Sequence, residues 1–134
     1  MTWAAWVAML ALAPMQDANI DSRIARAAEV FAAEGFKATG WTHSAMLEQN
    51  GVAALTLRLE RGRSYQVYGA CNDCRDIDLQ LLDPAGQEVD VDGQEDDAPF
   101  VSAPSATSGS YTLRVRMTAC RQAACRYGVA LFVK

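Results

Sequence analysis

Hydrophobic residues recur at every second position through most of the chain after residue 51. Such alternation places one face of a strand against a core and the other in water, as in antiparallel sheets. The alternating positions are Leu55, Leu57 and Leu59; Tyr65, Val67 and Gly69; Ile77, Leu79 and Leu81; Tyr111, Leu113, Val115 and Met117; and Tyr127, Val129, Leu131 and Val133. Turn-forming segments such as Asp83-Pro84-Ala85-Gly86 separate them. About seven short strands punctuated in this way predict an antiparallel β-sandwich of jelly-roll type.

One N-terminal helix is predicted before these strands, over residues 19–36. Its apolar residues follow one another at spacings of four, three and four, which puts them on one helix face; they are Ile20, Ile24, Ala27 and Phe31. Gly35 is suited to end the helix in a left-handed conformation. We expect this face to pack on the sheet, with docking to a partner protein as the alternative. The helix would then cover Tyr68 and Phe132, which lie out of phase with their buried neighbours and could otherwise form a ligand-stacking face.

The first residues predict a secretory signal peptide. Trp3 to Ala13 is an apolar run of 11 residues, and Ala11-Leu12-Ala13 has the small residues of a cleavage site. No Lys or Arg precedes the run, so a buried N-terminal helix is the alternative. We expect the signal peptide to cover residues 1–18, with the cut between 13 and 18. A helix and connecting segment over residues 19–50 and a sandwich domain over residues 51–134 would follow.

Four cysteines form two close pairs, Cys71 with Cys74 and Cys120 with Cys125. An even, paired set in a small exported domain predicts disulfides. Four cysteines allow three connectivities, so local bridges and bridges between the two pairs both stay open. A zinc site of four thiolates and a redox-active Cys-x-x-Cys are the alternatives. They are less favoured because the second pair is widely spaced and acidic residues flank the first.

Acidic residues are concentrated between residues 73 and 97, where ten carboxylates stand against the single Arg75. A hard cation would offset their repulsion, and calcium is bound by carboxylate and carbonyl oxygens in irregular loops. The candidate calcium ligands are Asp73, Asp76, Asp78, Asp92, Asp96 and Asp97. The segment is not an EF-hand, because Pro99 occupies the position that requires a bidentate Glu. A solvated acidic face that keeps the domain soluble is the alternative.

Composition narrows the classes of function. The 134 residues are 51% hydrophobic and 21% charged, as expected of one globular domain. A net charge of −4 argues against non-specific nucleic-acid binding, and no apolar run reaches the roughly 18 residues of a membrane span. His43 is the only histidine, and no known nucleophile, phosphate-loop or zinc-protease motif occurs. We therefore predict no catalytic residues and no enzymatic activity.

Two motifs suggest a family. Asp-x-Asp-Leu stands at Asp76-Ile77-Asp78-Leu79 before a glycine turn, and Gly-x-Tyr stands at Gly109-Ser110-Tyr111. With their surroundings, over roughly residues 52–133, they resemble bacterial pre-peptidase C-terminal domains. The resemblance implies a jelly-roll sandwich, export, and a non-catalytic role beside or after a secreted enzyme. It also implies that calcium or an insoluble substrate such as collagen could be bound, as in some relatives.

These observations predict an exported, periplasmic or secreted bacterial module that binds a ligand or assists another protein without catalysing a reaction. Its disulfides staple the sandwich, calcium is the candidate cofactor, and the ligand is a protein or a polysaccharide. The alternative is a structural or inhibitory protein of the cell envelope whose N-terminal helix docks a partner protein.

Overall fold

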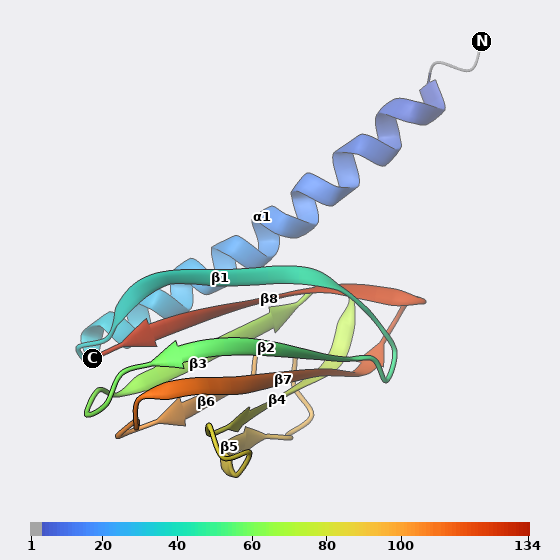
Figure 1. Ribbon diagram of the computed structural model, residues 1–134. Coiled ribbons are helices and arrows are strands. Elements are labelled where there is room, and N and C mark those ends of the chain that lie inside the picture. The colour runs from blue at the N-terminus through green and yellow to red at the C-terminus, as the bar shows by residue number, and fades with distance from the viewer. Residues whose placement is uncertain (1–3) are drawn as a thin grey trace.

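Within residues 4–134, eight strands form two layers, and one helix lies against the outer side of one layer (Figure 1). The structure is a computed structural model, which describes the backbone of residues 4–134 and the side chains from residue 18 onward. The elements in chain order are α1 (Ala4–Ala33), β1 (Lys37–Glu48), β2 (Val52–Leu59), β3 (Tyr65–Cys71), β4 (Cys74–Leu82), β5 (Glu88–Asp92), β6 (Phe100–Ala103), β7 (Gly109–Cys120) and β8 (Ala124–Val133).

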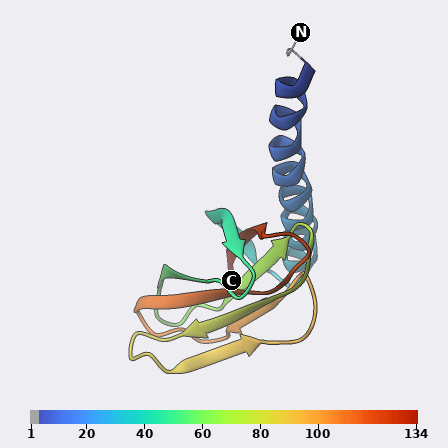
Figure 2. The ribbon, with the colours of Figure 1, turned by 90° about the vertical axis from the view of Figure 1, so that its right-hand side faces the viewer.

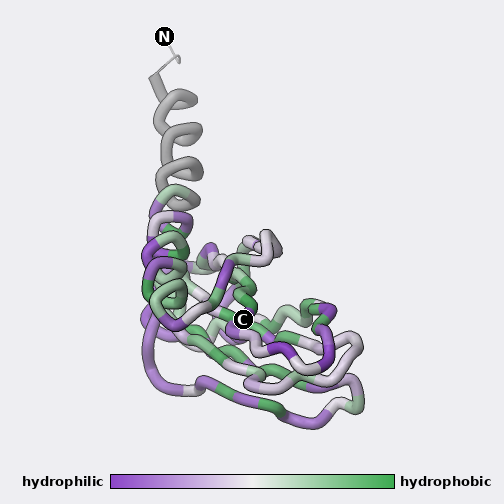
Figure 3. Tube along the Cα trace, turned by 90° about the vertical axis from the view of Figure 1, so that its left-hand side faces the viewer, coloured by the Kyte–Doolittle hydropathy of each residue, from purple (hydrophilic) through white to green (hydrophobic). Residues whose placement is uncertain are grey.

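The strands are arranged as a jelly roll, which confirms the predicted fold class. Sheet A has the order β1-β8-β3-β6 and sheet B the order β2-β7-β4-β5, with every neighbouring pair antiparallel. Figure 2 shows the two layers stacked face to face. Hydrophobic and polar residues alternate along the strands (Figure 3). The inward residues of both sheets, among them Leu79, Leu113 and Tyr127, are fully buried in the core between the layers.

The sandwich begins earlier in the chain than the sequence indicated. Residues 37–50 were expected to connect the helix to the sandwich, but Lys37–Glu48 forms β1, the edge strand of sheet A. Only alternate residues from Trp41 to Leu47 are half-buried, and its first four residues are exposed. An edge strand has one free side, so small and polar residues suffice there and the hydrophobic alternation is weak.

The helix α1 packs across the outer face of sheet A, as predicted. Ile20 and Phe31 are buried, and Phe31 forms a second small core with Ala130 and Phe132 of β8. The ring centroids of Phe31 and Phe132 lie 5.0 Å apart, and Tyr68 packs against the same cluster. The helix therefore covers the two out-of-phase aromatic residues. The face of α1 that contains Ile20 and Phe31 thus packs on sheet A, while Val30 of the same helix is exposed.

The C-terminus of α1 has the predicted left-handed glycine. Gly35 has a φ of 91°, and the amide of Phe36 donates to the carbonyl of Phe31 while that of Gly35 donates to Ala32. This pattern is a Schellman motif, which satisfies the last carbonyls of a helix. The accompanying hydrophobic contact joins Phe31 and Phe36, whose ring centroids are 6.4 Å apart.

The predicted signal peptide falls almost entirely on residues 1–17, whose side chains lie outside the part that the structure describes. The first buried residue of α1 in the described part is Ile20, C-terminal to the predicted cut between residues 13 and 18. From residue 4 onward, no helix has the length and apolarity needed to cross a membrane.

Candidate functional site

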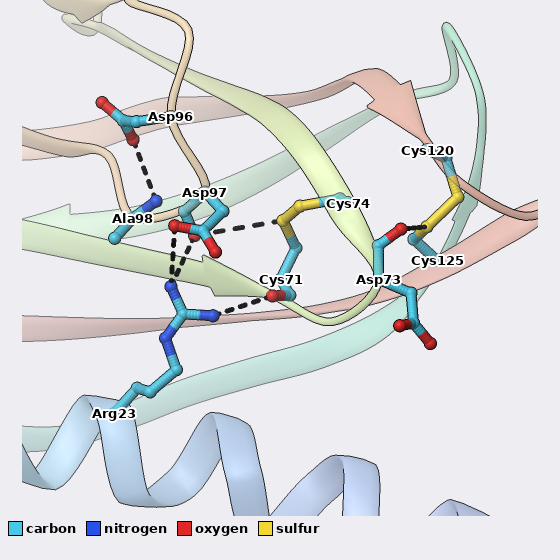
Figure 4. The surroundings of a disulfide bond; sticks show 9 residues. All are labelled: Arg23, Cys71, Asp73, Cys74, Asp96, Asp97, Ala98, Cys120 and Cys125. Atoms are coloured by element: carbon cyan, nitrogen blue, oxygen red, sulfur yellow. Dashed lines mark hydrogen bonds and ion pairs between the residues drawn. A yellow bond between two sulfur atoms is a disulfide. The ribbon is translucent and has the colours of Figure 1, made fainter.

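Two local disulfides close one end of the sandwich (Figure 4). Cys71 is bonded to Cys74 and Cys120 to Cys125, which leaves no free cysteine. Cys74 and Cys120 are register partners on β4 and β7, so the two bridges are neighbours. The structure thus selects the local connectivity among the three that the sequence allowed, and with all four sulfurs in disulfides no thiolate is left to hold a zinc ion.

The helix is tied to this end of the sandwich by Arg23. Its guanidinium donates to the carbonyl of Cys71 at 2.8 Å and to that of Asp97 at 3.0 Å. It also forms an ion pair with the Asp97 carboxylate at 3.2 Å (Figure 4). The loop that precedes β6 is therefore fastened both to α1 and, through the Asp97 carbonyl and the Cys71 amide, to β3.

Most of the six predicted calcium ligands are engaged by the protein itself. Asp97 pairs with Arg23, and Asp73 accepts a hydrogen bond from Gln122. Asp92 accepts from the amides of Gln94 and Phe100, and Asp96 accepts from the amide of Ala98. In the described part of the chain, no three His, Cys, Asp or Glu residues come together in an arrangement that could hold a metal ion.

Asp76 and Asp78 differ from the other four because each keeps a buried Oδ1 that no donor reaches, although Oδ2 of Asp78 accepts from the Thr118 hydroxyl at 3.1 Å. Asp76 is only 8% exposed. Burial, followed by charge repulsion from Asp78 and a hydrogen bond between the two carboxyl groups, raises the pKa of Asp76 to about 6. Burial is also the main cause that raises the pKa of Asp96. Asp76, Asp78 and Asp96 are thus brought into one electrostatic cluster, whereas Asp73 hydrogen-bonds on the opposite side of β4, to the β7–β8 turn.

His43, the single histidine of the sequence, packs against an aromatic ring. Its ring lies on β1 beside that of Tyr127, with the centroids 5.9 Å apart. Burial raises the pKa of the Tyr127 phenol above its ordinary value of 10, so this neighbour stays protonated at neutral pH. The pair fits the core of the sandwich better than a proton-transfer site.

The outer face of sheet B is not covered by any described element, in contrast to that of sheet A. The strand register places three parallel rows of side chains on this face. The rows are Val52, Arg116 and Asp78; Ala54, Arg114, Gln80 and Val91; and Thr56, Thr112 and Leu82. Arg58 extends the face beyond the third row, where it donates to Ser110. A shallow cavity of about 240 Å³ lies over the first two rows.

Arg114 and Arg116 carry positive charge on this face, where Asp78 and Glu88 carry negative charge. Both arginines are exposed, and neither forms an ion pair or hydrogen bond with a described residue. They alternate on one strand, so their side chains lie roughly 7 Å apart and point to the same side. This surface is not predicted by the sequence. The alternation of Arg114 and Arg116 with buried residues was visible, but their apposition to Gln80 and Asp78 depends on the β4–β7 pairing.

Comparison with known proteins identifies the fold. The pre-peptidase C-terminal domain of a collagenase from Bacillus anthracis matches with a TM-score of 0.56 and 11% identity, over 68% of this chain and 87% of that domain. This chain has the fold of a pre-peptidase C-terminal domain. A periplasmic inhibitor of g-type lysozyme from Aeromonas hydrophila, PliG, matches with a TM-score of 0.51 and 12% identity, over 70% of this chain and 85% of the inhibitor. No family model and no curated protein matches the sequence.

Proposed function

We propose that the chain is an exported, non-catalytic binding module that takes an acidic polysaccharide on the outer face of sheet B. The observation that supports this most strongly is the pair of exposed guanidiniums of Arg114 and Arg116, which have no ion-pair partner among the described residues and lie on a sheet face that no described element covers. Guanidinium forks bind carboxylates and other oxyanions in bidentate geometry. The rest of the chain is acidic, so these cations are a local exception to a net charge of −4.

A polysaccharide suits this face better than a protein. Protein interfaces depend on a few aromatic or aliphatic anchors buried in pockets, and the rows of sheet B contain no aromatic residue. They offer a flat array of polar groups instead, with the hydroxyls of Thr56 and Thr112 beside the arginines. The side-chain amide of Gln80 in the same row donates to Glu88 at 2.9 Å. An extended polymer with repeated carboxylates can lie along such rows.

The similar folds support a binding role without chemistry. One is a domain of a collagenase, and the other is an inhibitor of a lysozyme. The local disulfides and the apolar N-terminal run support export, since disulfides persist in oxidising compartments.

Binding of polygalacturonate to the exported protein, measured by biolayer interferometry, tests the proposal. The neutral polymer galactan serves as the matched ligand control. We expect the double variant R114A/R116A to weaken polygalacturonate binding by roughly tenfold or more, as expected when charge-assisted hydrogen bonds are lost. The variant R26A/R121A removes the same charge from α1 and from the β7–β8 turn and should bind normally. Equal losses in both variants, or no binding of polygalacturonate by the natural chain, would contradict the proposal.

Calcium is a second part of the proposal, restricted to Asp76 and Asp78. Their unpartnered buried oxygens fit a hard cation, which would supply the positive charge that the two carboxylates lack. The remaining ligands would have to be waters or backbone carbonyls, because the other four aspartates are engaged. Thermal melting at pH 7 with millimolar calcium should raise the Tm of the natural chain and leave that of D76N unchanged. If calcium leaves the Tm of the natural chain unchanged, the proposed calcium site is wrong.

Inhibition of a cell-envelope enzyme is the second candidate function. Its support is the fold shared with PliG, and it does not require the helix to dock, because sheet A already occupies the described apolar face of α1. Addition of the exported protein to a g-type lysozyme assay tests it, and unchanged lysis at a large molar excess would reject it.

A further inference from the structure

A second cleft lies at the open edge of the sandwich, away from the arginine rows. Edge strand β1 of sheet A and edge strand β2 of sheet B follow each other in the chain but do not pair with each other. Where β1 begins and β2 ends, they leave a cleft of about 520 Å³. Trp41, Leu57, Tyr65 and Leu131 supply its apolar lining, and Arg58 and Arg63 lie at its rim. This volume falls within the range of small-molecule sites.

A bulge in β1 creates the position of Trp41. The register with β8 shifts between Ala38 and Thr42, so that residues 39–41 oppose the single residue Leu131. The hydroxyl of Thr39 donates to the Leu131 carbonyl at 2.9 Å and accepts from the amide of Trp41 at 3.1 Å. Gly40, at the centre of the bulge, has a φ of 89°, a conformation that other residues adopt only with strain. Bulges re-aim side chains, often beside binding sites.

The chemistry of the cleft combines an aromatic ring with charged and hydroxyl groups. Trp41 is half-buried and packs against the core while it lines the cleft. Glu60 and Arg63 form an exposed ion pair at 3.9 Å on the rim, and Thr39 and Thr56 line the same cleft. The Tyr65 hydroxyl is already used, since it accepts from the amide of Glu60. A pyranose ring has an apolar face that stacks on an indole and equatorial hydroxyls that such a polar rim can bind.

We propose that this cleft binds one or two neutral sugar rings of a glycan, with Trp41 as the stacking platform and Arg58, Glu60 and Arg63 as partners of the hydroxyl groups. The cleft adjoins the acidic-ligand face on sheet B, with which it shares Thr56 and Arg58, but it contains neither Arg114 nor Arg116. It is built from both sheets, so it requires the folded sandwich. The bulge at Gly40 is the feature that presents the indole to the ligand.

Tryptophan fluorescence of the exported protein tests this site directly. The sequence has three tryptophans, of which two, Trp3 and Trp6, precede the predicted cut. The probes are cellohexaose, xylohexaose and chitohexaose, each titrated to 5 mM, a value roughly fivefold above the 1 mM Kd that marks weak binding. We expect at least one to shift the emission of Trp41, the tryptophan that follows the cut. Unchanged emission with all three hexasaccharides would overturn the proposal.

Calorimetric titration of variants with the responding hexasaccharide separates the cleft from general effects on folding. W41A and R63A should weaken binding by roughly tenfold each. F100A, which removes an aromatic side chain 50% exposed on β6, should bind as the natural chain does.

G40A, which alters the bulge, should also weaken binding of the hexasaccharide. Its matched control is G86A, because Gly86 has a similar φ of 82° and the same open surroundings in the β4–β5 turn. Equal affinity of G40A and G86A would show that the bulge does not position the site.

Discussion

Asp76 is the single buried charged residue among the side chains that the structure describes. It lies on β4 beside Asp78, and burial with charge repulsion raises its pKa from the ordinary value of 3.8 to about 6. Between these two values the folded protein holds a proton that the unfolded chain has lost. By linkage, this proton stabilises the fold at low pH, and the stabilisation is lost as the pH rises through about 6. Asp76 therefore opposes folding at neutral pH unless a cation lies beside it.

The variant D76N should be more stable than the natural chain at pH 7.5 in the presence of EDTA. The amide removes the buried charge, and its NH₂ group can donate to the carboxylate of Asp78. We expect a gain of about 1–3 kcal/mol, the usual cost of a buried polar group left without a partner. The gain should fall to roughly half by pH 5 and approach zero only as the pH falls below the unfolded value of 3.8. Thermal melts of both proteins from about pH 3.5 to 7.5 measure it.

The control for this comparison is D21N, since Asp21 is exposed on α1 and should show no such pH-dependent gain. A D76N protein that is less stable than the natural chain in EDTA at pH 7.5 would mean that the charged form is stabilised in the fold.

Among the elements, α1 can pack closely on sheet A because β8 has a glycine, Gly128, at the point of contact. A Cβ atom at Gly128 would lie 2.5 Å from Cγ2 of Ile20 and 3.6 Å from Cδ1 of Ile24. Contacts below 3 Å require something to move, and the nearest atom belongs to a branched, buried side chain. The missing side chain at Gly128 therefore allows the helix to approach the sheet.

G128A should destabilise the fold by about 1–3 kcal/mol, as overpacking does in a closely packed interior. Urea unfolding followed by circular dichroism measures the change. G93A provides the control, because Gly93 has no atom within 4 Å of its added Cβ and no positive φ. Equal stability of G128A and the natural chain would show that the helix does not sit on β8 in solution.

The disulfides also stabilise the arrangement of elements, because they join β3 to β4 and β7 to β8. Each closes a short loop, with sequence separations of 3 and 5. Loop-closure entropy then assigns about 2 kcal/mol of stability to each bridge. Since Cys74 and Cys120 are register partners, the two contributions should couple rather than add.

We expect C71A/C74A and C120A/C125A each to lower the free energy of unfolding by about 2 kcal/mol, and the fourfold variant to differ from their sum. Denaturant unfolding of the three variants measures both effects. Four thiols that react with an alkylating reagent in the unreduced, unfolded natural chain would contradict the local pairing.

For the whole molecule, we predict export, removal of the signal peptide and formation of both disulfides. Expressed in a bacterium with an export pathway, the chain should be recovered from the periplasm or medium without its first 13 to 18 residues. The part that remains contains every described contact of α1 with the sandwich, beginning at Ile20. Intact-mass spectrometry before and after reduction measures the cut and the two bridges together. Recovery of the uncut chain from the cytoplasm would contradict export.

Local patterns were sufficient to predict much of this molecule. Period-two hydrophobicity identified the inward residues of the central strands, because pleating alone sends alternate side chains to opposite faces. The spacing of apolar residues predicted which face of α1 packs on the sheet, and Gly35 predicted where the helix ends. Both depend only on neighbours along the chain. The three strands that the alternation missed, β1, β5 and β6, are short or polar edge strands, where one side is free of the core.

The sequence by itself therefore determined the class of the fold, the buried faces and the even set of cysteines, since each follows from neighbours along the chain. The tertiary structure alone decided which cysteines pair, which aspartates are buried, and that Arg114 and Arg116 meet Gln80 and Asp78 on an open face. It also decided that Trp41 lines a cleft with Leu131. These are contacts between residues dozens of positions apart, and they exist only after long-range strand pairing has fixed the register.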